Sequence, residues 1–182
     1  MKLKAGKILV SEPFMIDPNF KRTVILICEH EDHGTTGFIL NKHLNVNMNE
    51  LLEDFPEIKS QVMIGGPVAP DSIHYLHNMG DILDDSLEVC PGIWWGGDFE
   101  KLKFLIDSGL IQDKNIKFFV GYSGWTEGQL EEELKEGSWL IEDMDTNYLF
   151  KIKSFVLWQT VLKNKGDAFT VIAQMPDSTN LN

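Results

Sequence analysis

A serine flanked by glycines is the first candidate for chemistry in this sequence. It lies in the segment Gly121-Tyr122-Ser123-Gly124-Trp125, which partly matches the nucleophile-elbow motif G-x-S-x-G. That motif needs glycine two places after the serine, but here the bulky indole of Trp125 stands there. We therefore favour a non-catalytic turn, in which the glycines permit close packing and Tyr122 and Trp125 cover the edge of a sheet.

The glycines of the same segment could instead cradle a phosphate. Gly121, Gly124 and Gly128 precede a predicted helix, and helix N-termini bind anions. However, the Lys-Ser/Thr pair of a P-loop does not follow. Acidic residues at 127 and 131–133 crowd the first turns and already complement the positive end of the helix. A nucleotide site is therefore not expected here.

Two pairs of histidines, His30 with His33 and His74 with His77, have the spacing of possible metal ligands. In a strand, residues i and i+3 point to opposite faces, so each pair could share a metal only if the backbone turns. A zinc site also needs at least three converging ligands. Structural hydrogen bonding is the simpler interpretation, and no metal or cofactor is predicted.

These candidates surround the most clearly patterned stretch of the chain, residues 116–141. Alternating apolar residues predict a strand that ends at Gly121. Thr126, followed three residues later by Gln129, forms a capping box and predicts that a helix begins there. Gly137 is typical of a helix end, and the alternation beyond it predicts a second strand.

Gly and Pro divide the rest of the chain into short elements. Strands are predicted at residues 7–10, 22–30, 37–41, 61–64, 73–76, 87–90 and 93–95. Helices are predicted at residues 48–55, 98–109, 148–163 and 167–174, with Asp98 as the N-cap of the second. Because we find no linker, repeat or low-complexity segment, we predict one α+β domain over residues 1–182, with a polar tail from about residue 176.

The charge of the chain narrows the choice of partner. It carries 28 acidic and 16 basic side chains, for a formal net charge of -12. Such a surface repels phosphate backbones and anionic lipids, which proteins bind mainly through Lys and Arg. We therefore expect no direct nucleic-acid binding and no membrane binding, and a basic protein partner is favoured.

The compartment is inferred from cysteines and hydropathy. Cys28 and Cys90 are too few and too far apart for a disulfide framework or a CxxC metal site, so reduced thiols are expected. The N-terminal apolar run, residues 8–10, is too short for a signal peptide. No stretch approaches 18 apolar residues. The protein is predicted to be cytoplasmic.

An ordered set of motifs runs along nearly the whole chain. The set comprises Glu29-His30, Gly34, Gly37, Asn41, Gly65-Gly66-Pro67-Val68, Leu76-His77, Gly121-Tyr122-Ser123-Gly124-Trp125, Gly128-Gln129-Leu130-Glu131 and Trp139. Together these motifs resemble those of the AlgH/YqgE family of bacterial proteins. The resemblance implies an α+β fold with a bent, bifurcated sheet, mixed or antiparallel, that resembles a barrel and is flanked by helices. Members carry the label of transcriptional regulator without a settled mechanism, and the family supplies no catalytic residues.

The matched family positions are polar and rich in glycine, unlike a core, which suggests a small polar pocket. We hypothesise that it lies near residues 122–129 and that its ligand-binding residues are His30, Asn41, His77, Tyr122 and Gln129.

Two classes of function follow. The first is a non-catalytic regulatory or interaction protein that acts through protein partners and not by binding DNA. The absent catalytic motif, the acidic surface and the label of the family favour it. The alternative is a small-molecule-binding or metal-binding protein, or a hydrolytic enzyme, with its site near the glycine-rich segment and His30.

Overall fold

The computed structural model describes residues 2–176, so the expected polar tail lies almost wholly outside the described residues. The strands are β1 (Lys7–Ser11), β2 (Val24–Glu31), β3 (Gly34–Ile39), β4 (His43–Leu44), β5 (Val62–Ile64), β6 (Val68–His77), β7 (Leu87–Cys90), β8 (Ile93–Trp95), β9 (Ile116–Thr126) and β10 (Trp139–Asp143). The helices are α1 (Met48–Leu51), α2 (Phe99–Asp107), α3 (Gln129–Lys135), α4 (Thr146–Phe150), α5 (Ser154–Lys163) and α6 (Asp167–Ala173).

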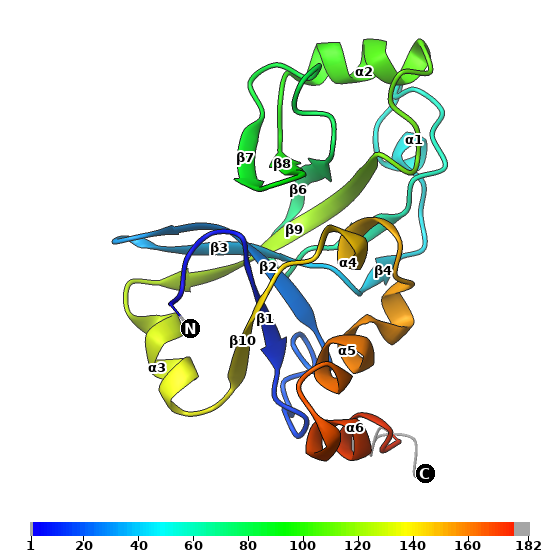
Figure 1. Cartoon of the computed structure of the whole chain (residues 1–182). Helices are drawn as coiled ribbons and strands as arrows, with labels where there is room; N and C mark the ends of the chain where they lie inside the picture. The colour runs from blue at the N-terminus through cyan, green and yellow to red at the C-terminus, as the bar shows by residue number, and fades with distance from the viewer. Residues whose placement is uncertain (1, 177–182) are drawn as a thin grey trace.

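The strands form a curled sheet in the order β10-β1-β2-β3-β9-β6-β8-β7, and all neighbours along this path are antiparallel (Figure 1). The sheet divides at β9. The first half of β9 pairs with β6 and, in parallel, with β5, whereas its last residues pair with β3. The prediction of a bent, bifurcated α+β fold is confirmed.

Strand β2 explains how the sheet is covered on both faces. Its alternate side chains enter two different apolar clusters, Leu26 in one and Ile25 and Ile27 in the other. Helix α5 adds Leu157 and Trp158 to the first cluster, and α3 adds Leu130 to the second. A strand that is apolar on both parities is expected to be buried on both sides.

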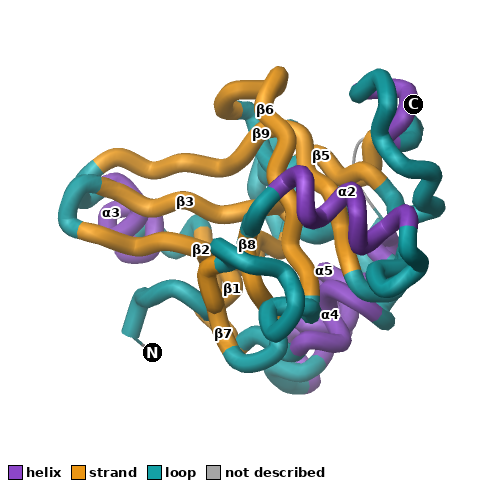
Figure 2. The backbone as a smooth tube through the Cα atoms, turned by 90° about the horizontal axis from the view of Figure 1, so that it is seen from above, coloured by secondary structure: helices purple, strands orange, loops and turns teal. Residues whose placement is uncertain are grey.

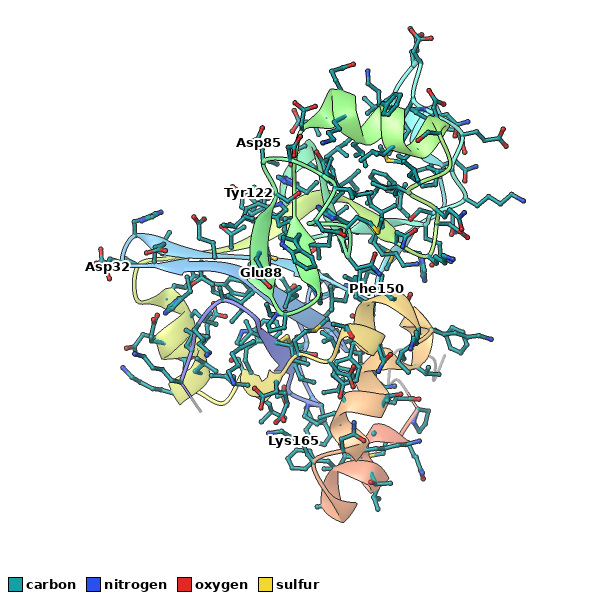
Figure 3. The ribbon with its side chains drawn as sticks, turned by 45° about the horizontal axis from the view of Figure 1, so that its top comes forward. Asp32, Asp85, Glu88, Tyr122, Phe150 and Lys165 are labelled. Atoms are coloured by element: carbon teal, nitrogen blue, oxygen red, sulfur yellow. The ribbon has the colours of Figure 1, made fainter. Side chains whose placement is uncertain are left out.

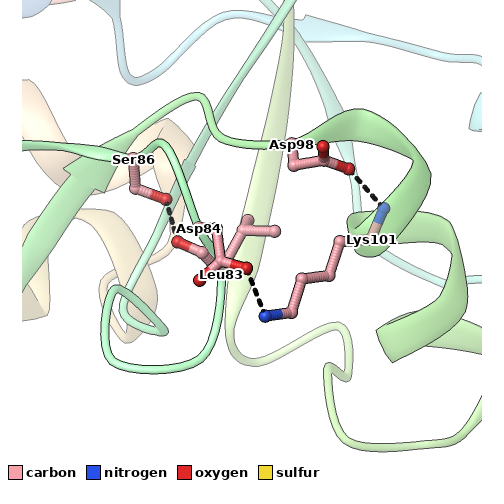
Figure 4. Close-up of polar contacts among 5 residues, drawn as sticks. All are labelled: Leu83, Asp84, Ser86, Asp98 and Lys101. Atoms are coloured by element: carbon pink, nitrogen blue, oxygen red, sulfur yellow. Dashed lines mark hydrogen bonds and ion pairs between the residues drawn. The ribbon is translucent and has the colours of Figure 1, made fainter.

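Helix α2 closes a third apolar cluster at the other end of the molecule. Its predicted N-cap is confirmed, because the Asp98 carboxylate accepts a hydrogen bond from the backbone N–H of Lys101 at 2.7 Å. Lys101 Nζ also pairs with Asp84 at 2.6 Å, and Ser86 donates to the carbonyl of Leu83 at 2.7 Å (Figure 4). These contacts fix the loop before β7 against the start of α2.

Two predictions at the end of β9 are wrong. The strand does not end at Gly121 but continues to Thr126, because Gly121 adopts a φ of 64° and the chain resumes pairing beyond it. The helix begins at Gln129 and not at Thr126. Only half of the expected capping box forms, since the Gln129 side chain accepts from the Thr126 N–H at 3.1 Å. The glycine-rich segment is therefore strand and not a strand-to-helix turn.

The helix predicted at residues 148–163 is also wrong as one element. It is divided into α4 and α5 by residues 151–153. The N–H groups of Lys151 and Ile152 both donate to the carbonyl of Asn147, which ends α4. Other boundaries differ from the predicted ones. Helix α1 ends four residues before the predicted end, whereas β3 and β6 begin earlier than predicted.

No helix within residues 2–176 is both long and apolar enough to span a bilayer.

Candidate functional site

Several of the motif residues gather where three strands project from the body of the molecule. We call this part the tip: residues 28–31 of β2, 34–37 of β3 and 122–126 of β9. The three strands run side by side with α3 packed against one face (Figures 1 and 2). The registers place His30, Thr35 and Trp125 in one row across the tip, and Glu29, Thr36 and Gly124 in the next. Adjacent rows point to opposite faces.

On the α3 face, a histidine lies between a hydroxyl and a carboxylate. His30 Nδ1 is 2.7 Å from the Oγ1 of Thr35, and His30 Nε2 is 3.8 Å from a carboxylate oxygen of Glu131. The side chain of His30 is 23% exposed and that of Glu131 is 45% exposed. They border a hollow of about 640 Å³ that also meets Lys2 and Glu127.

The arrangement of His30 resembles a catalytic relay in composition but not in geometry. The contact of 3.8 Å to Glu131 is too long for a hydrogen bond, and Thr35 is only 5% exposed. Ser123 is fully buried, and its hydroxyl donates to the carbonyl of Gly65 at 3.0 Å. Neither hydroxyl is placed to act as a nucleophile, which needs an accessible oxygen and a base within hydrogen-bond reach.

The opposite face of the tip carries a smaller groove of about 320 Å³. Tyr122 and Val68 form its apolar part, and Glu29 and Thr36 lie on its polar side. The ring of Tyr122 lies over Gly124, since a Cβ at that glycine would be 3.2 Å from the ring. Beside this groove, β9 beyond Tyr122 pairs only with β3, so one edge of the strand has no paired neighbour within the described chain.

Carboxylates surround both faces of the tip. They are Glu29, Glu31, Asp32, Glu127 and Glu131. Asp32 lies at the outer end of the projection, and Tyr122 lies nearer the body of the molecule (Figure 3). Lys2 and Lys4 are the basic side chains that line the larger hollow. The tip is thus predominantly acidic.

Three of the five residues predicted to bind a ligand belong to this region, but they do not share one cavity. His30 borders the hollow on the α3 face and Tyr122 lines the groove on the other. Gln129 begins α3 and donates to Glu133 at 2.9 Å. The three therefore support different surfaces of the tip.

The other two predicted residues lie elsewhere and have structural partners. Asn41 Oδ1 accepts from the N–H of Val24 at 2.9 Å, and its Nδ2 donates to the carbonyl of Arg22 at 2.8 Å. His77 pairs with Ile116 at the start of β9, whereas the row of His30 crosses β9 at Trp125. About 30 Å of strand separates these positions at roughly 3.3 Å per residue. The five residues do not form one pocket.

The histidines do not converge on a metal either. Within residues 2–176, no group of three or more His, Cys, Asp and Glu side chains is arranged to hold one. His74 Nε2 is 3.0 Å from the hydroxyl of Ser72, and His77 Nε2 is 2.8 Å from the carbonyl of Gly96. Burial lowers the pKa of both histidines, and for His77 the bond to Gly96 partly opposes that effect.

Sequence reasoning missed the partners that complete the tip. Thr35, Thr36 and Val68 lie in predicted loops or before a predicted strand, so they were not candidates. Extending the register of Ile27 with Gly37 along the hairpin would place Thr35 opposite Glu29. The pairing of Thr35 with His30 depends on an irregularity between Ile27 and Glu29, for which the sequence gives no local signal. Val68 follows a glycine pair and carries no local signal either.

Comparisons with known proteins agree with this architecture. The profile of the AlgH-like family matches residues 8–170. A UPF0301 protein of Chlorobaculum parvum is 42% identical over 180 residues, covering 99% of this chain and 96% of the relative. A UPF0301 protein of Cytophaga hutchinsonii is also 42% identical, covering 99% of this chain and 100% of the relative.

Two solved structures share the fold. The solution structure of the AlgH protein from Pseudomonas aeruginosa has a TM-score of 0.75 at 27% identity, covering 97% of this chain and 99% of that one. A crystal structure of a Corynebacterium diphtheriae protein has a TM-score of 0.80 at 20% identity, covering 96% and 94% of the two chains, and shows likeness of fold alone. With the profile match and relatives of 42% identity over nearly whole chains, this chain belongs to the AlgH-like family.

Proposed function

We propose that this chain is a non-catalytic regulatory protein that acts in the cytoplasm by binding a protein partner. The tip would receive an extended, basic segment of that partner along the unpaired edge of β9. The observation that carries the proposal is the combination of this edge, the groove at Tyr122 and the surrounding carboxylates. No reaction is assigned, since the hydroxyls of Thr35 and Ser123 are both buried.

The edge of β9 supplies the backbone part of recognition. An extended peptide can add to an exposed sheet edge, where main-chain hydrogen bonds supply affinity and side-chain pockets supply specificity. The groove of about 320 Å³ offers Tyr122 and Val68 to one apolar side chain of such a peptide. Val68 is 37% exposed, which is high for a residue of its type within a strand.

The carboxylates near the groove would favour basic partners over acidic ones. Glu29 lines the groove, and Glu31 and Asp32 follow it on the same hairpin. Basic side chains on the incoming segment would be attracted to this rim, and the net charge of -12 would steer them from a distance. The same field repels nucleic acid, so regulation would operate through protein contacts.

An array of extended ten-residue peptides tests the proposal. The array would contain basic, neutral and acidic sequences, each with alternating apolar residues, and the intact chain would be applied in about 0.15 M salt. Basic peptides should be captured preferentially. Tyr122→Ala and Glu29→Lys should each weaken capture about tenfold, which corresponds to about 1.4 kcal/mol of binding free energy.

Glu57→Lys is the matched control, because Glu57 is an exposed residue of a loop away from the tip. It makes the same change of net charge as Glu29→Lys and should leave most of the affinity intact. If Glu57→Lys weakens capture as much as Glu29→Lys does, binding depends only on net charge and the tip is not the site. Equal capture of basic and acidic peptides would also refute the proposal.

A further inference from the structure

A second hollow lies on a different part of the molecule, where the connection between α4 and α5 packs beside β4 and the start of β9 (Figure 1). Its volume is about 380 Å³, which is within the range of small-molecule sites. The connection is the break at residues 151–153 that divides the two helices. Phe150, at the end of α4, marks its position in Figure 3.

The charge of this hollow is opposite to that of the rest of the chain. Its lining includes Lys117, Lys151, Lys153 and His43, and it contains no carboxylate. In the described part of the chain, none of the three lysines has a carboxylate within 4.0 Å. Four cationic or protonatable groups without a counter-ion are unexpected in a chain with a net charge of -12.

Lys117 is the least exposed of these groups. It extends from β9, is half-buried, and burial lowers the pKa of its ammonium, an effect that the more distant carboxylate of Asp113 partly offsets. Burial also lowers the pKa of His43, and the charge of Lys117 adds to that effect. A bound anion would relieve this repulsion between like charges.

The start of α5 adds further donors to the same hollow. Lys153 is the N-cap residue of this ten-residue helix, and no side chain caps the helix there. Ser154 and Phe155 of the first turn line the hollow. Uncapped N–H groups and the positive end of the helix dipole attract anions, so the backbone field has the same sign as the lysines.

Apolar side chains form another part of the wall, beside the polar Gln61 and Tyr148. They are Leu40, Met63, Leu149, Phe150 and Ile152, with Phe155 at the rim, where it is 76% exposed. A hollow of about 380 Å³ with such walls is larger than one inorganic phosphate requires. The apolar walls and the exposed ring therefore suit an organic group attached to the anion.

We propose that the hollow between the α4–α5 connection and the sheet binds a small organic phosphate, with the phosphate held by Lys117, Lys151 and Lys153 and the organic group against Phe150 and Phe155. Lysine is a common phosphate ligand because its ammonium is a compact charge with three donors. A phosphate carries more charge than a carboxylate, which fits a hollow lined by three lysines. This site is separate from the tip and does not depend on its proposed role.

Thermal shift and titration calorimetry on the intact chain test the proposal. The probes are inorganic phosphate, phenyl phosphate and a nucleoside monophosphate, each compared with NaCl of equal ionic strength, and the unphosphorylated nucleoside. The organic phosphates should raise Tm above the NaCl control and bind more tightly than inorganic phosphate, and the nucleoside should do neither. If no phosphate compound raises Tm beyond the NaCl control, the proposal is wrong.

Substitutions of single lysines test whether the phosphate compounds bind in this hollow. Lys117→Met and Lys151→Met should each weaken binding of the organic phosphates at least about tenfold, since charge-assisted hydrogen bonds are lost. Both should fold, because Lys117→Met removes a half-buried charge and Lys151 is exposed. Lys103→Met, on the distant helix α2, is the control and should bind like the wild type. Equal weakening by all three variants, or by none, would show that the phosphate binds elsewhere and would overturn the proposal.

Discussion

His77 is a buried histidine whose neighbours accept only its neutral form. Its Nε2 donates to the carbonyl of Gly96 at 2.8 Å, and its Nδ1 accepts from the N–H of Met79 at 3.2 Å. Protonation would place a second N–H on Nδ1, directly facing the N–H of Met79. Burial lowers the pKa of His77, although the bond to Gly96 acts in the other direction.

We predict that the free energy of unfolding falls as the pH is lowered below about 6.5. The unfolded chain binds a proton at His77 near its usual pKa of 6.5, whereas the folded chain does so only at lower pH. Stability is therefore fully present above pH 6.5 and is lost as the pH falls toward the lowered pKa. Each such histidine contributes a slope of up to about 1.4 kcal/mol per pH unit. His43 and His74 add to it in the same direction.

Urea unfolding of His77→Gln between pH 5 and 8 measures how much His77 contributes to the pH dependence of the free energy of unfolding. The variant should be less stable at pH 8 by about 1–3 kcal/mol, because two hydrogen bonds are disturbed, and its slope below pH 6.5 should be shallower. The exposed His33→Gln is the control and should retain the wild-type slope. An unchanged slope in His77→Gln would mean that His77 is protonated equally in both states.

Helix α3 is held against the sheet by one carboxylate. Glu133 Oε2 accepts from the indole N–H of Trp125 at 2.9 Å and from that of Trp139 at 2.7 Å. The two indoles, on β9 and β10, are 5% and 3% exposed, so water cannot replace the carboxylate easily. Gln129 orients the other oxygen of Glu133 from one turn earlier. The helix is short, and tertiary contacts such as these must supply most of its stability.

We predict that Glu133→Ala lowers the free energy of unfolding by about 2–5 kcal/mol, since each buried N–H left without a partner costs about 1–3 kcal/mol. Glu133→Gln keeps one acceptor oxygen and should cost less. Glu132→Ala is the control: this neighbour is 68% exposed and pairs only with Lys135, so its loss should cost less than about 1 kcal/mol. Equal losses from the variants at 132 and 133 in urea unfolding would contradict the assignment of Glu133.

The glycine-rich motif shows which elements could be predicted from sequence. Alternation found the first half of β9 correctly, but Gly121 was taken as the strand end. In the fold, Gly121 lets two segments meet, because a Cβ there would lie 2.6 Å from the carbonyl oxygen of Gly66. A Cβ at Gly65 would lie 2.3 Å from the carbonyl oxygen of Gly121. Local pattern identifies a special glycine but not the distant backbone that requires it.

Local sequence pattern also could not show which distant residues meet at the candidate site. Of the residues predicted to bind a ligand, His30 and Tyr122 lie in the tip and Gln129 begins the helix packed against it, and the acidic segments nearby were visible in the sequence. The position of His77 at the other end of β9 depended on the pairing of β6 with β9, which no local spacing reveals. The break at residues 151–153 was hidden as well, since Lys and Ile are compatible with a continuing helix. Lys151 and Lys153 therefore fell within one predicted helix and Lys117 within a predicted strand, with nothing in the sequence to join them.

The excess of negative charge acts on the molecule as a whole. Ion pairs such as Lys101 with Asp84 and Lys103 with Glu100 join exposed carboxylates, and each is worth only about 0–1 kcal/mol. With 28 acidic and 16 basic side chains, at least twelve acids must remain without a basic partner. Repulsion among them destabilises the compact state, and the tip concentrates several of them on one hairpin.

We predict that salt has opposite effects on folding and on the proposed peptide binding. Raising NaCl from about 0.01 M to about 1 M shortens the screening length from about 30 Å to about 3 Å. This screens the repulsion between acids more than the few ion pairs, so Tm should rise by about 2–4 °C, equivalent to about 1 kcal/mol. Capture of basic peptides at the tip should weaken over the same range, because the attraction that selects them is screened.

Glu57→Lys lowers the net negative charge away from the tip, and its Tm should rise less with salt. A Tm that falls with salt would show that attraction between charges outweighs repulsion in the folded chain, and peptide capture insensitive to salt would show that the acidic rim does not select the partner.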